Sequence, residues 1–363
     1  MLSSILVFLI VLSILVLVHE FGHYFIARKN GIWVEEFGFG LPPRVIGKKI
    51  GETIYSINLF PFGGFVRLHG ENDETGVTKP KRAFLGKSKR VRFGVVVAGV
   101  VMNFILAVFA FAIVYSFSGI PRETGVVKVV DISPGSPAQS GGMVVGDIVK
   151  KVDGKEVSSV DEFVKKVEEK KGKKTFIELE GEKRLILTPR GNPPEGEGPL
   201  GVVITTTEIY FPPVWQRPFL GIYYGFKDAV FWGRTVIMGF VSIFTSLFQG
   251  VVPKDIAGPV GIFAVTSEAA KIGILALINF IGILSVNLAI LNILPFPALD
   301  GGRLLFIGIE GIIGKKVVPK IESAIHSVGM VILLLLLLAI TAHDIRRLIS
   351  AGGISGFIDQ VLK

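Results

Sequence analysis

Residues 2–27 read LSSILVFLIVLSILVLVHEFGHYFIA, an apolar run longer than the roughly 20 residues that a helix needs to cross a bilayer. No basic residue precedes the run, and Arg28 and Lys29 follow it, so we expect a retained span rather than a cleaved signal peptide. Three further apolar runs occupy residues 93–117, 272–299 and 328–342, and the last reaches spanning length if it begins near residue 325. The sequence therefore predicts about four transmembrane helices.

The composition of the 363 residues agrees with a membrane protein. Half of the residues are hydrophobic and 19% are charged, whereas about 25% are charged in an average soluble chain. This excludes a disordered protein and argues against an ordinary soluble enzyme. The chain has no cysteine, which excludes disulfides, thiolate metal sites and cysteine nucleophiles. Any metal must therefore be held by His, Asp or Glu.

The distribution of the net charge of +9 along the chain predicts which loops lie on which side of the membrane. Residues 28–92 carry 13 Lys and Arg against 6 Asp and Glu, whereas residues 120–212 carry 14 against 15. Because basic loops stay in the cytoplasm, we expect 28–92 inside the cell and 120–271 outside, rather than a nucleic-acid surface. Residues 219–252 are apolar but contain charged residues, so an interfacial helix is expected there rather than a further span.

Residues 120–205 differ from the long apolar runs in their sequence pattern, and this pattern indicates a small extracytoplasmic α+β domain. Short β-type runs alternate with turn residues, and residues 159–171 form a helix-like segment that starts with a capping box, Ser159 and Glu162. The stretch 133–154, SPGSPAQSGGMVVGDIVKKVDG, resembles the signature of a PDZ domain. Such domains bind extended peptides or C-termini, so we expect a peptide partner here, with a rigid spacer as the alternative.

The end of the first run contains His19-Glu20-Phe21-Gly22-His23. Two His four residues apart lie on one face of a helix and can bind one zinc ion, while Glu20 beside them can take a proton from zinc-activated water. Ionisable residues within an apolar helix are costly without such a task. The alternative is that the span ends at Val18 and the three residues lie at the aqueous surface. The isolated His69, His326 and His343 are expected at the surface.

A catalytic zinc usually has three protein ligands, and the sequence offers one strong candidate for the third. Asp300 is the only acidic residue between Glu268 and Glu310, and it follows the proline-containing stretch NILPFPAL (292–299). Prolines and glycines break the helix there, and the freed backbone groups must line a protein cavity rather than lipid. The predicted topology places Asp300 at the same depth as His23.

The combination of His19-Glu20-x-x-His23 with Leu299-Asp300-Gly301 on a later span resembles the site-2 protease family of intramembrane zinc proteases. The PDZ-like insertion is similar to the bacterial branch that includes the regulator-of-sigma-E protease. This resemblance implies His19, His23 and Asp300 as ligands of Zn2+ and Glu20 as the catalytic general base.

The resemblance also implies substrate-binding elements. It implies a re-entrant β-hairpin over residues 51–70, which contain Gly63 and Gly64, and a role for Asn287 and Asn292 in handling the substrate backbone. Asn103 lies in a family-like Ala-Gly-x-x-x-Asn-Phe context, where hydrogen bonding between helices is an equally good interpretation.

We therefore expect a polytopic α-helical membrane protein with a re-entrant β-hairpin and one inserted PDZ-like domain. Its predicted parts are 1–119 with spans one and two, the PDZ-like domain 120–205, an interfacial segment 206–271, and 272–363 with spans three and four. The predicted function is hydrolysis of peptide bonds within transmembrane segments of single-pass proteins, such as an anti-sigma factor or remnant signal peptides. The alternative function is a membrane-anchored PDZ scaffold with structural or no zinc. The predicted location is the inner membrane, with the active site near the cytoplasmic leaflet and no nucleic-acid partner.

Overall fold

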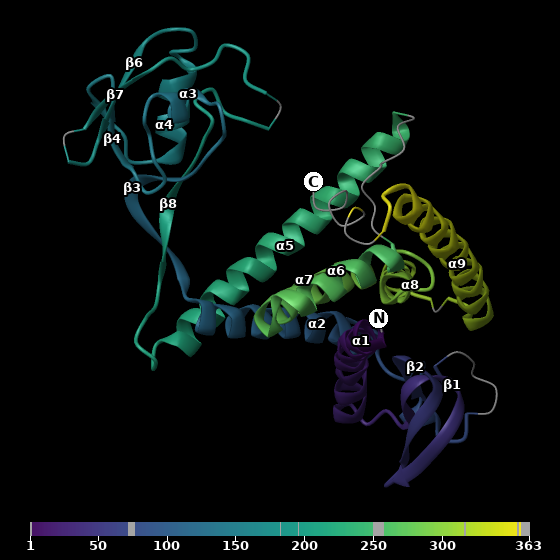
Figure 1. The fold of residues 1–363 in the computed structure, drawn as a ribbon. Helices are drawn as coiled ribbons and strands as arrows, with labels where there is room; N and C mark the ends of the chain where they lie inside the picture. The colour runs from purple at the N-terminus through teal and green to yellow at the C-terminus, as the bar shows by residue number, and fades with distance from the viewer. Residues whose placement is uncertain are drawn as a thin grey trace. The chain divides into compact units, whose positions relative to one another are not determined.

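The computed structural model describes residues 2–71, 77–181, 183–194, 196–249, 258–315, 317–353 and 356, and at residues 62, 244 and 247 it describes the backbone alone. The chain forms two compact units (Figure 1). The first combines Met1–Phe117 with Pro218–Lys363, and the second is Ser118–Arg217. Residues 250–257 of the expected interfacial segment lie outside the described residues.

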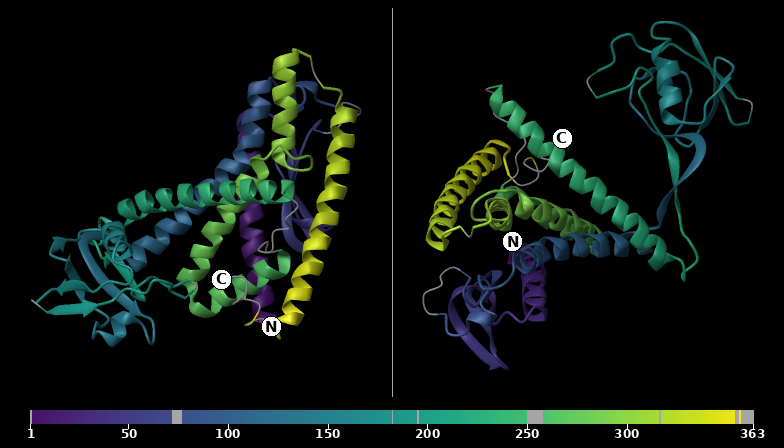
Figure 2. Two further views of the ribbon diagram at one scale, coloured as in Figure 1. Left: turned by 90° about the horizontal axis from the view of Figure 1, so that it is seen from above. Right: turned by 180° about the vertical axis from the view of Figure 1, so that it is seen from behind.

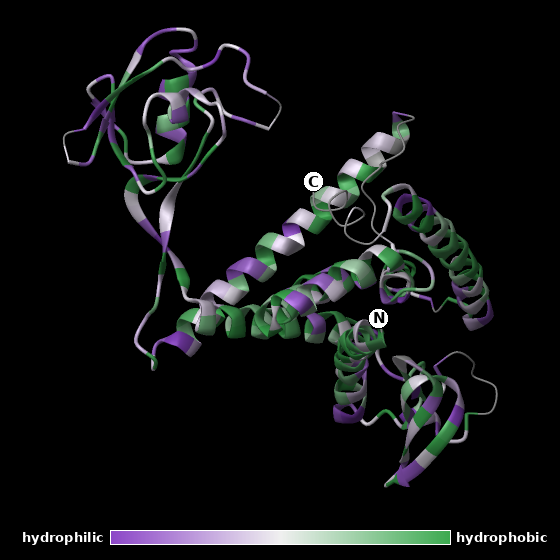
Figure 3. Ribbon diagram, viewed as in Figure 1, coloured by the Kyte–Doolittle hydropathy of each residue, from purple (hydrophilic) through white to green (hydrophobic). Residues whose placement is uncertain are grey.

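Long helices dominate the first unit. They are α1 (Leu2–Lys29), α2 (Lys89–Ser118), α5 (Arg217–Phe248), α6 (Pro259–Ile272), α7 (Ile274–Ile293), α8 (Asp300–Ile313) and α9 (Pro319–Ser350). Within the described residues, the four helices α1, α2, α7 and α9 are long and apolar enough to cross a membrane. Hydrophobic residues follow these helices along most of their length (Figure 3). The expected number of helices with the length and apolar composition of membrane spans is confirmed for the described residues.

The third apolar run is less continuous than its composition indicates. Gly273, with φ 141°, separates α6 from α7, and α7 ends at Ile293 rather than near residue 299. The chain cannot continue as a helix because Pro295 and Pro297 lack backbone N–H groups and clash with the preceding turn. This break lets Asp300 begin a separate helix, α8.

Helices α1 and α2 approach each other closely at two glycines. A Cβ atom at Gly22 would lie 2.3 Å from the carbonyl oxygen of Ala98, and one at Gly99 would lie 2.5 Å from Nε2 of His23. Small residues at such a crossing let two backbones come into contact. The part of α1 around Gly22 and His23 is thereby held against the part of α2 around Ala98 and Gly99.

A two-stranded sheet packs beside α1, which contacts both of its strands, the second more extensively (Figure 2). It consists of β1 (Val34–Ile50) and β2 (Thr53–Leu68). The stretch 51–70, expected as a hairpin by itself, contributes a single bent strand that pairs with β1. Phe37 is paired with both Val66 and Tyr55, so the start of β1 lies between two segments of β2. A short 3-10 helix, η1 (Pro80–Arg82), follows before α2.

The second unit contains a six-stranded sheet with the order β7-β6-β4-β3-β8, and β5 pairs with β4. Its strands are β3 (Ile120–Ile132), β4 (Ile148–Val152), β5 (Lys155–Glu156), β6 (Thr175–Leu179), β7 (Arg184–Leu187) and β8 (Val202–Tyr210), and its helices are α3 (Pro137–Ser140) and α4 (Val160–Glu168). The expected helix near residues 159–171 is α4, and the Ser159 side chain accepts a hydrogen bond from the Glu162 N–H, as the capping box predicts. Buried Val127, Phe163 and Ile177 belong to one apolar core.

Candidate metal centre

The two histidines of the apolar motif project from one face of α1 because they are one turn apart. Their Nε2 atoms lie 3.2 Å from each other. Only 7% of the surface of His19 is exposed to solvent. Helix α1 continues without a break past Val18 to Lys29, so His19, Glu20 and His23 lie on the same helix as the apolar run.

Asp300 completes a group of three converging donor atoms. Its Oδ2 atom lies 3.0 Å from Nε2 of His19 and 3.2 Å from Nε2 of His23. The Asp300 carboxylate reaches this position because α8 starts directly after the bend at Ala298, which has φ 80°. A Cβ atom at Gly301 would lie 1.8 Å from the carbonyl oxygen of Leu294, so only glycine fits behind the aspartate.

A single face of α2 supports both imidazoles. Val95, Gly99 and Asn103 are spaced four residues apart and therefore lie above one another on the helix. The Nδ1 atom of His23 is 2.8 Å from the Val95 carbonyl oxygen, and Nδ1 of His19 is 3.2 Å from the amide nitrogen of Asn103. Gly99 between them leaves the space that the two rings occupy.

This donor set fits a zinc ion. A carbonyl oxygen can only accept, so Nδ1 of His23 carries the proton and its Nε2 offers a lone pair. Donor atoms bound at 2.0–2.2 Å around a tetrahedral ion lie about 3.4 Å apart, close to the separations observed between His19, His23 and Asp300. Within the described residues, these three form the one group of metal-binding side chains whose donor atoms lie within 4.8 Å of one another. Two imidazoles and one carboxylate are a common ligand set of catalytic zinc.

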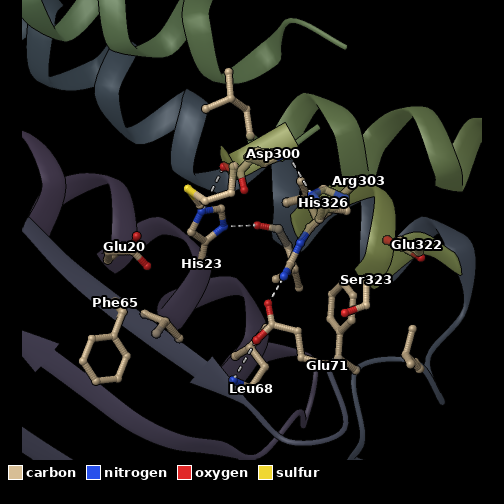
Figure 4. A pocket seen from close by; sticks show the side chains of 18 of the residues that line it. Glu20, His23, Phe65, Leu68, Glu71, Asp300, Arg303, Glu322, Ser323 and His326 are labelled. Atoms are coloured by element: carbon tan, nitrogen blue, oxygen red, sulfur yellow. Dashed lines mark hydrogen bonds and ion pairs between the residues drawn. The ribbon is translucent and has the colours of Figure 1, made fainter. Parts of the chain in front are cut away.

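A cavity of about 550 Å³ opens beside the three residues. Glu20 lines it next to His23 and Asp300, and the ion pair of Arg303 with Glu71 crosses it (Figure 4). This arrangement places the carboxylate of Glu20 beside the candidate metal ligands, in a cavity that Glu71, Arg303 and Glu322 also line.

A buried ion pair fixes α8 against α2. Arg92 of α2 contacts Glu310 of α8, and both side chains are 3% exposed. The Glu310 carboxylate also accepts a hydrogen bond from the Val317 N–H, and its backbone carbonyl accepts one from the Lys89 ammonium. These contacts hold the helix that carries Asp300 beside the helix that supports the two histidines.

The residues predicted for substrate binding lie in different places. Gly64 is close to the site, since a Cβ atom there would be 3.7 Å from Cγ of Glu20, and Gly63 precedes it in β2 with φ 83°. The side-chain amide of Asn287 donates to the Ile283 carbonyl of its own helix. Asn292 lies near the end of α7. Neither asparagine is among the residues that line the cavity.

Two histidines expected at the surface are placed differently. His69 is buried, and its Nδ1 lies 2.7 Å from a carboxylate oxygen of Glu35. His326 lines the cavity, and its Nδ1 accepts a hydrogen bond from the Ala298 N–H at 3.0 Å. Sequence spacing gave no signal for either contact, because both partners are remote in the chain. His343 is exposed, as expected.

The chain is similar to known proteins over most of its length. A model described as peptidase family M50 matches residues 7–336. A presumed zinc metalloprotease of Clostridium perfringens is 36% identical over 93% of this chain and 97% of its own. One from Clostridium acetobutylicum is 33% identical over 94% of this chain and 97% of its own. Zinc metalloprotease RasP of Geobacillus kaustophilus is 29% identical over 95% of this chain and 98% of its own.

Proposed function

This chain belongs to peptidase family M50, the site-2 protease family of zinc metalloproteases, and from this premise we propose that it hydrolyses peptide bonds inside membrane-spanning segments. It is a zinc-dependent endopeptidase and an integral membrane protein. The observation that carries the proposal is the position of His19, Glu20 and His23 within α1, a helix long and apolar enough to span a bilayer. A protease site built into such a helix meets its substrate within the membrane.

The reaction follows from the placement of these residues. His19, His23 and Asp300 would hold the zinc ion, which would supply Lewis-acid chemistry toward water and the scissile carbonyl. The Glu20 carboxylate takes the proton of the attacking water and passes it to the nitrogen of the leaving amine. The polar groups of the cavity, Glu71, Arg303 and Glu322, give water a route to the site.

A helical substrate hides its peptide bonds, so the segment to be cut must first become extended. We expect it to add as a strand beside β2, in which Gly63 precedes Gly64 and Gly64 lies next to Glu20. Gly64 is crowded, since a Cβ atom there would be 3.0 Å from the Gly38 carbonyl and 3.4 Å from the Leu17 side chain. Exposed apolar side chains on the two strands, among them Val45, Ile46 and Leu59, support insertion of this sheet into the membrane as a re-entrant element.

The second unit is proposed to act as a PDZ-like domain. The sheet, α4 and the resemblance of residues 133–154 to a PDZ signature support this assignment. Its partner would be an extended peptide or a C-terminus. The proposed substrates are single-pass proteins, such as an anti-sigma factor, or remnant signal peptides. The excess of basic residues in 28–92 supports an inner-membrane orientation with the site near the cytoplasmic leaflet and the second unit outside.

The role of Glu20 is tested by the variant Glu20→Gln in purified full-length protein reconstituted with a single-pass substrate. We expect cleavage to fall at least about 100-fold, because the amide cannot accept the water proton, while bound zinc stays at the wild-type level. Glu268→Gln is the matched control, because Glu268 forms an ion pair with Lys271 of its own helix α6 and does not line the cavity. Undiminished cleavage by Glu20→Gln would remove Glu20 from the mechanism.

A further inference from the structure

Asn103 of α2 contacts the metal centre through the side of His19 that faces away from Asp300. It is fully buried in α2, and its side-chain amide lies 3.2 Å from Nδ1 of His19. The sequence leaves two equal interpretations of Asn103, and the structure shows that its contact with another helix is made to a candidate metal ligand. The hydrogen bond therefore acts on the outer nitrogen of a ring whose inner nitrogen, Nε2, faces Asp300 and His23.

The metal chemistry decides which amide atom faces the ring. Nε2 of His19 can bind zinc only if it is unprotonated, and a neutral imidazole then carries its proton on Nδ1. That proton needs an acceptor, and the carbonyl oxygen of the Asn103 amide supplies one when the amide is turned with Oδ1 toward the ring. For His23 the same task is performed by the backbone carbonyl of Val95. One face of α2 would thus fix the tautomer of both ligands.

The position of Asn103 is itself secured from a third helix. The Ser285 hydroxyl of α7 donates a 2.8 Å hydrogen bond to the backbone carbonyl of Asn103. One and two turns further along α2, the buried Ala107 and Phe111 pack in a cluster with Ala229 and Val286. The side chain of Asn103 is therefore presented from a well-packed backbone, which is the condition for orienting a neighbouring ring.

We propose that Asn103 is a positioning residue whose side-chain oxygen accepts the Nδ1 proton of His19 and so presents Nε2 to the zinc ion. The inference rests on His19 being a zinc ligand, as the proposed function requires. It goes beyond that function in assigning to a residue of α2 the control of metal affinity, because outer partners of a ligand histidine set its tautomer and orientation.

The test measures zinc affinity of the purified full-length protein by competition with a chromophoric chelator, together with its melting temperature without metal. We expect Asn103→Ala to weaken zinc binding about 10- to 100-fold. Asn103→Asp keeps an oxygen acceptor at the same place and should stay within about threefold of the wild type. Thr266→Ala is the control, because Thr266 is equally buried and its hydroxyl bonds only within α6 to the Ile262 carbonyl in the described contacts.

The possible outcomes distinguish a failure of this inference from a failure of the proposed function. Wild-type zinc affinity in Asn103→Ala would overturn the inference, and so would an affinity loss in Asn103→Asp equal to that in Asn103→Ala, because the amide nitrogen would then be the required atom. If His19→Ala also kept its zinc, the ligand assignment itself would fail. Loss of zinc in His19→Ala with normal affinity in Asn103→Ala would remove only the role of Asn103.

Discussion

At the scale of single residues, Gly99 is the glycine whose replacement would act directly on the two histidine rings. It is the point at which α2 faces both rings, and a Cβ atom there would lie 2.5 Å from Nε2 of His23 and 2.7 Å from Cε1 of His19. Backbone atoms around it are fixed by the helix crossing at Gly22, so the rings rather than the helices would have to move. A methyl group added at Gly99 therefore strikes the donor atoms themselves.

We predict that Gly99→Ala lowers zinc content and cleavage at least about tenfold, because displaced ligands bind metal poorly. Metal analysis and substrate cleavage measure the two effects. Gly94→Ala in the same helix is the matched control, because a Cβ atom at Gly94 meets nothing within 4 Å. Equal zinc content in the two variants would show that the crossing at Gly99 is looser than the structure indicates.

At the scale of elements, the start of α6 is stabilised from another helix. Asp344 of α9 is fully buried, and its Oδ2 accepts a 3.0 Å hydrogen bond from the N–H of Gly261 in the first turn of α6. A Cβ atom at Gly258 would lie 2.8 Å from the same oxygen, so glycine is needed where the carboxylate enters. Negative groups at a helix N-terminus satisfy free N–H donors and interact favourably with the helix dipole.

We predict that Asp344→Ala lowers the unfolding free energy by about 1–2 kcal/mol, the usual effect of losing an N-terminal cap. Asp344→Asn retains an oxygen acceptor and should lose less. Thermal or denaturant unfolding in detergent measures both, with the exposed His343→Ala as the neighbouring control. A stability of Asp344→Ala equal to that of the control would contradict a capping role.

The β4–β5 hairpin of the second unit contains a charge that makes its stability depend on pH. Asp153 and Gly154 form its two-residue turn, both with positive φ, as an Asp-Gly turn of this type requires. The Lys170 ammonium at 2.8 Å and the Phe176 N–H hold the pKa of Asp153 below its usual value.

Because the folded pKa is lowered, the contribution of Asp153 to stability is complete above the unfolded pKa of about 3.9 and is lost as the pH falls through the folded pKa. We predict that the wild type loses stability below about pH 4 more steeply than Asp153→Asn does. Asn tolerates positive φ, so this variant removes the charge and keeps the turn. Hydrogen exchange of β4 and β5 over this pH range measures the difference, and identical profiles would contradict it.

At the scale of the whole molecule, the sequence predicted what depends on local spacing. Spanning helices follow from long apolar runs, and the convergence of His19, His23 and Asp300 follows from a one-turn spacing plus topology. The contact of His326 with Ala298 and the pairing of β2 on both sides of β1 depend on segments remote in sequence, so periodicity could not reveal them. The spacing of residues 95, 99 and 103 predicts one shared helix face, but the contact of Asn103 with the remote His19 is visible only in the structure.

The organisation of the first unit supports the same chemistry from several helices. Helix α1 supplies two donors and Glu20, α8 supplies Asp300, α2 supports the rings, and α9 contributes His326 to the loop before Asp300. Hydrolysis within a membrane requires a polar site that is enclosed by apolar helices. A metal centre assembled from apolar helices and joined to a cavity with charged lining residues meets this requirement.

The most direct test of this account is to map where the protein cuts. Purified full-length protein with zinc is reconstituted with a single-pass substrate, and the new termini of the products are identified by mass spectrometry. We predict termini within the apolar membrane-spanning segment, absent from reactions with Glu20→Gln. Cleavage confined to the polar regions outside that segment would contradict the central claim.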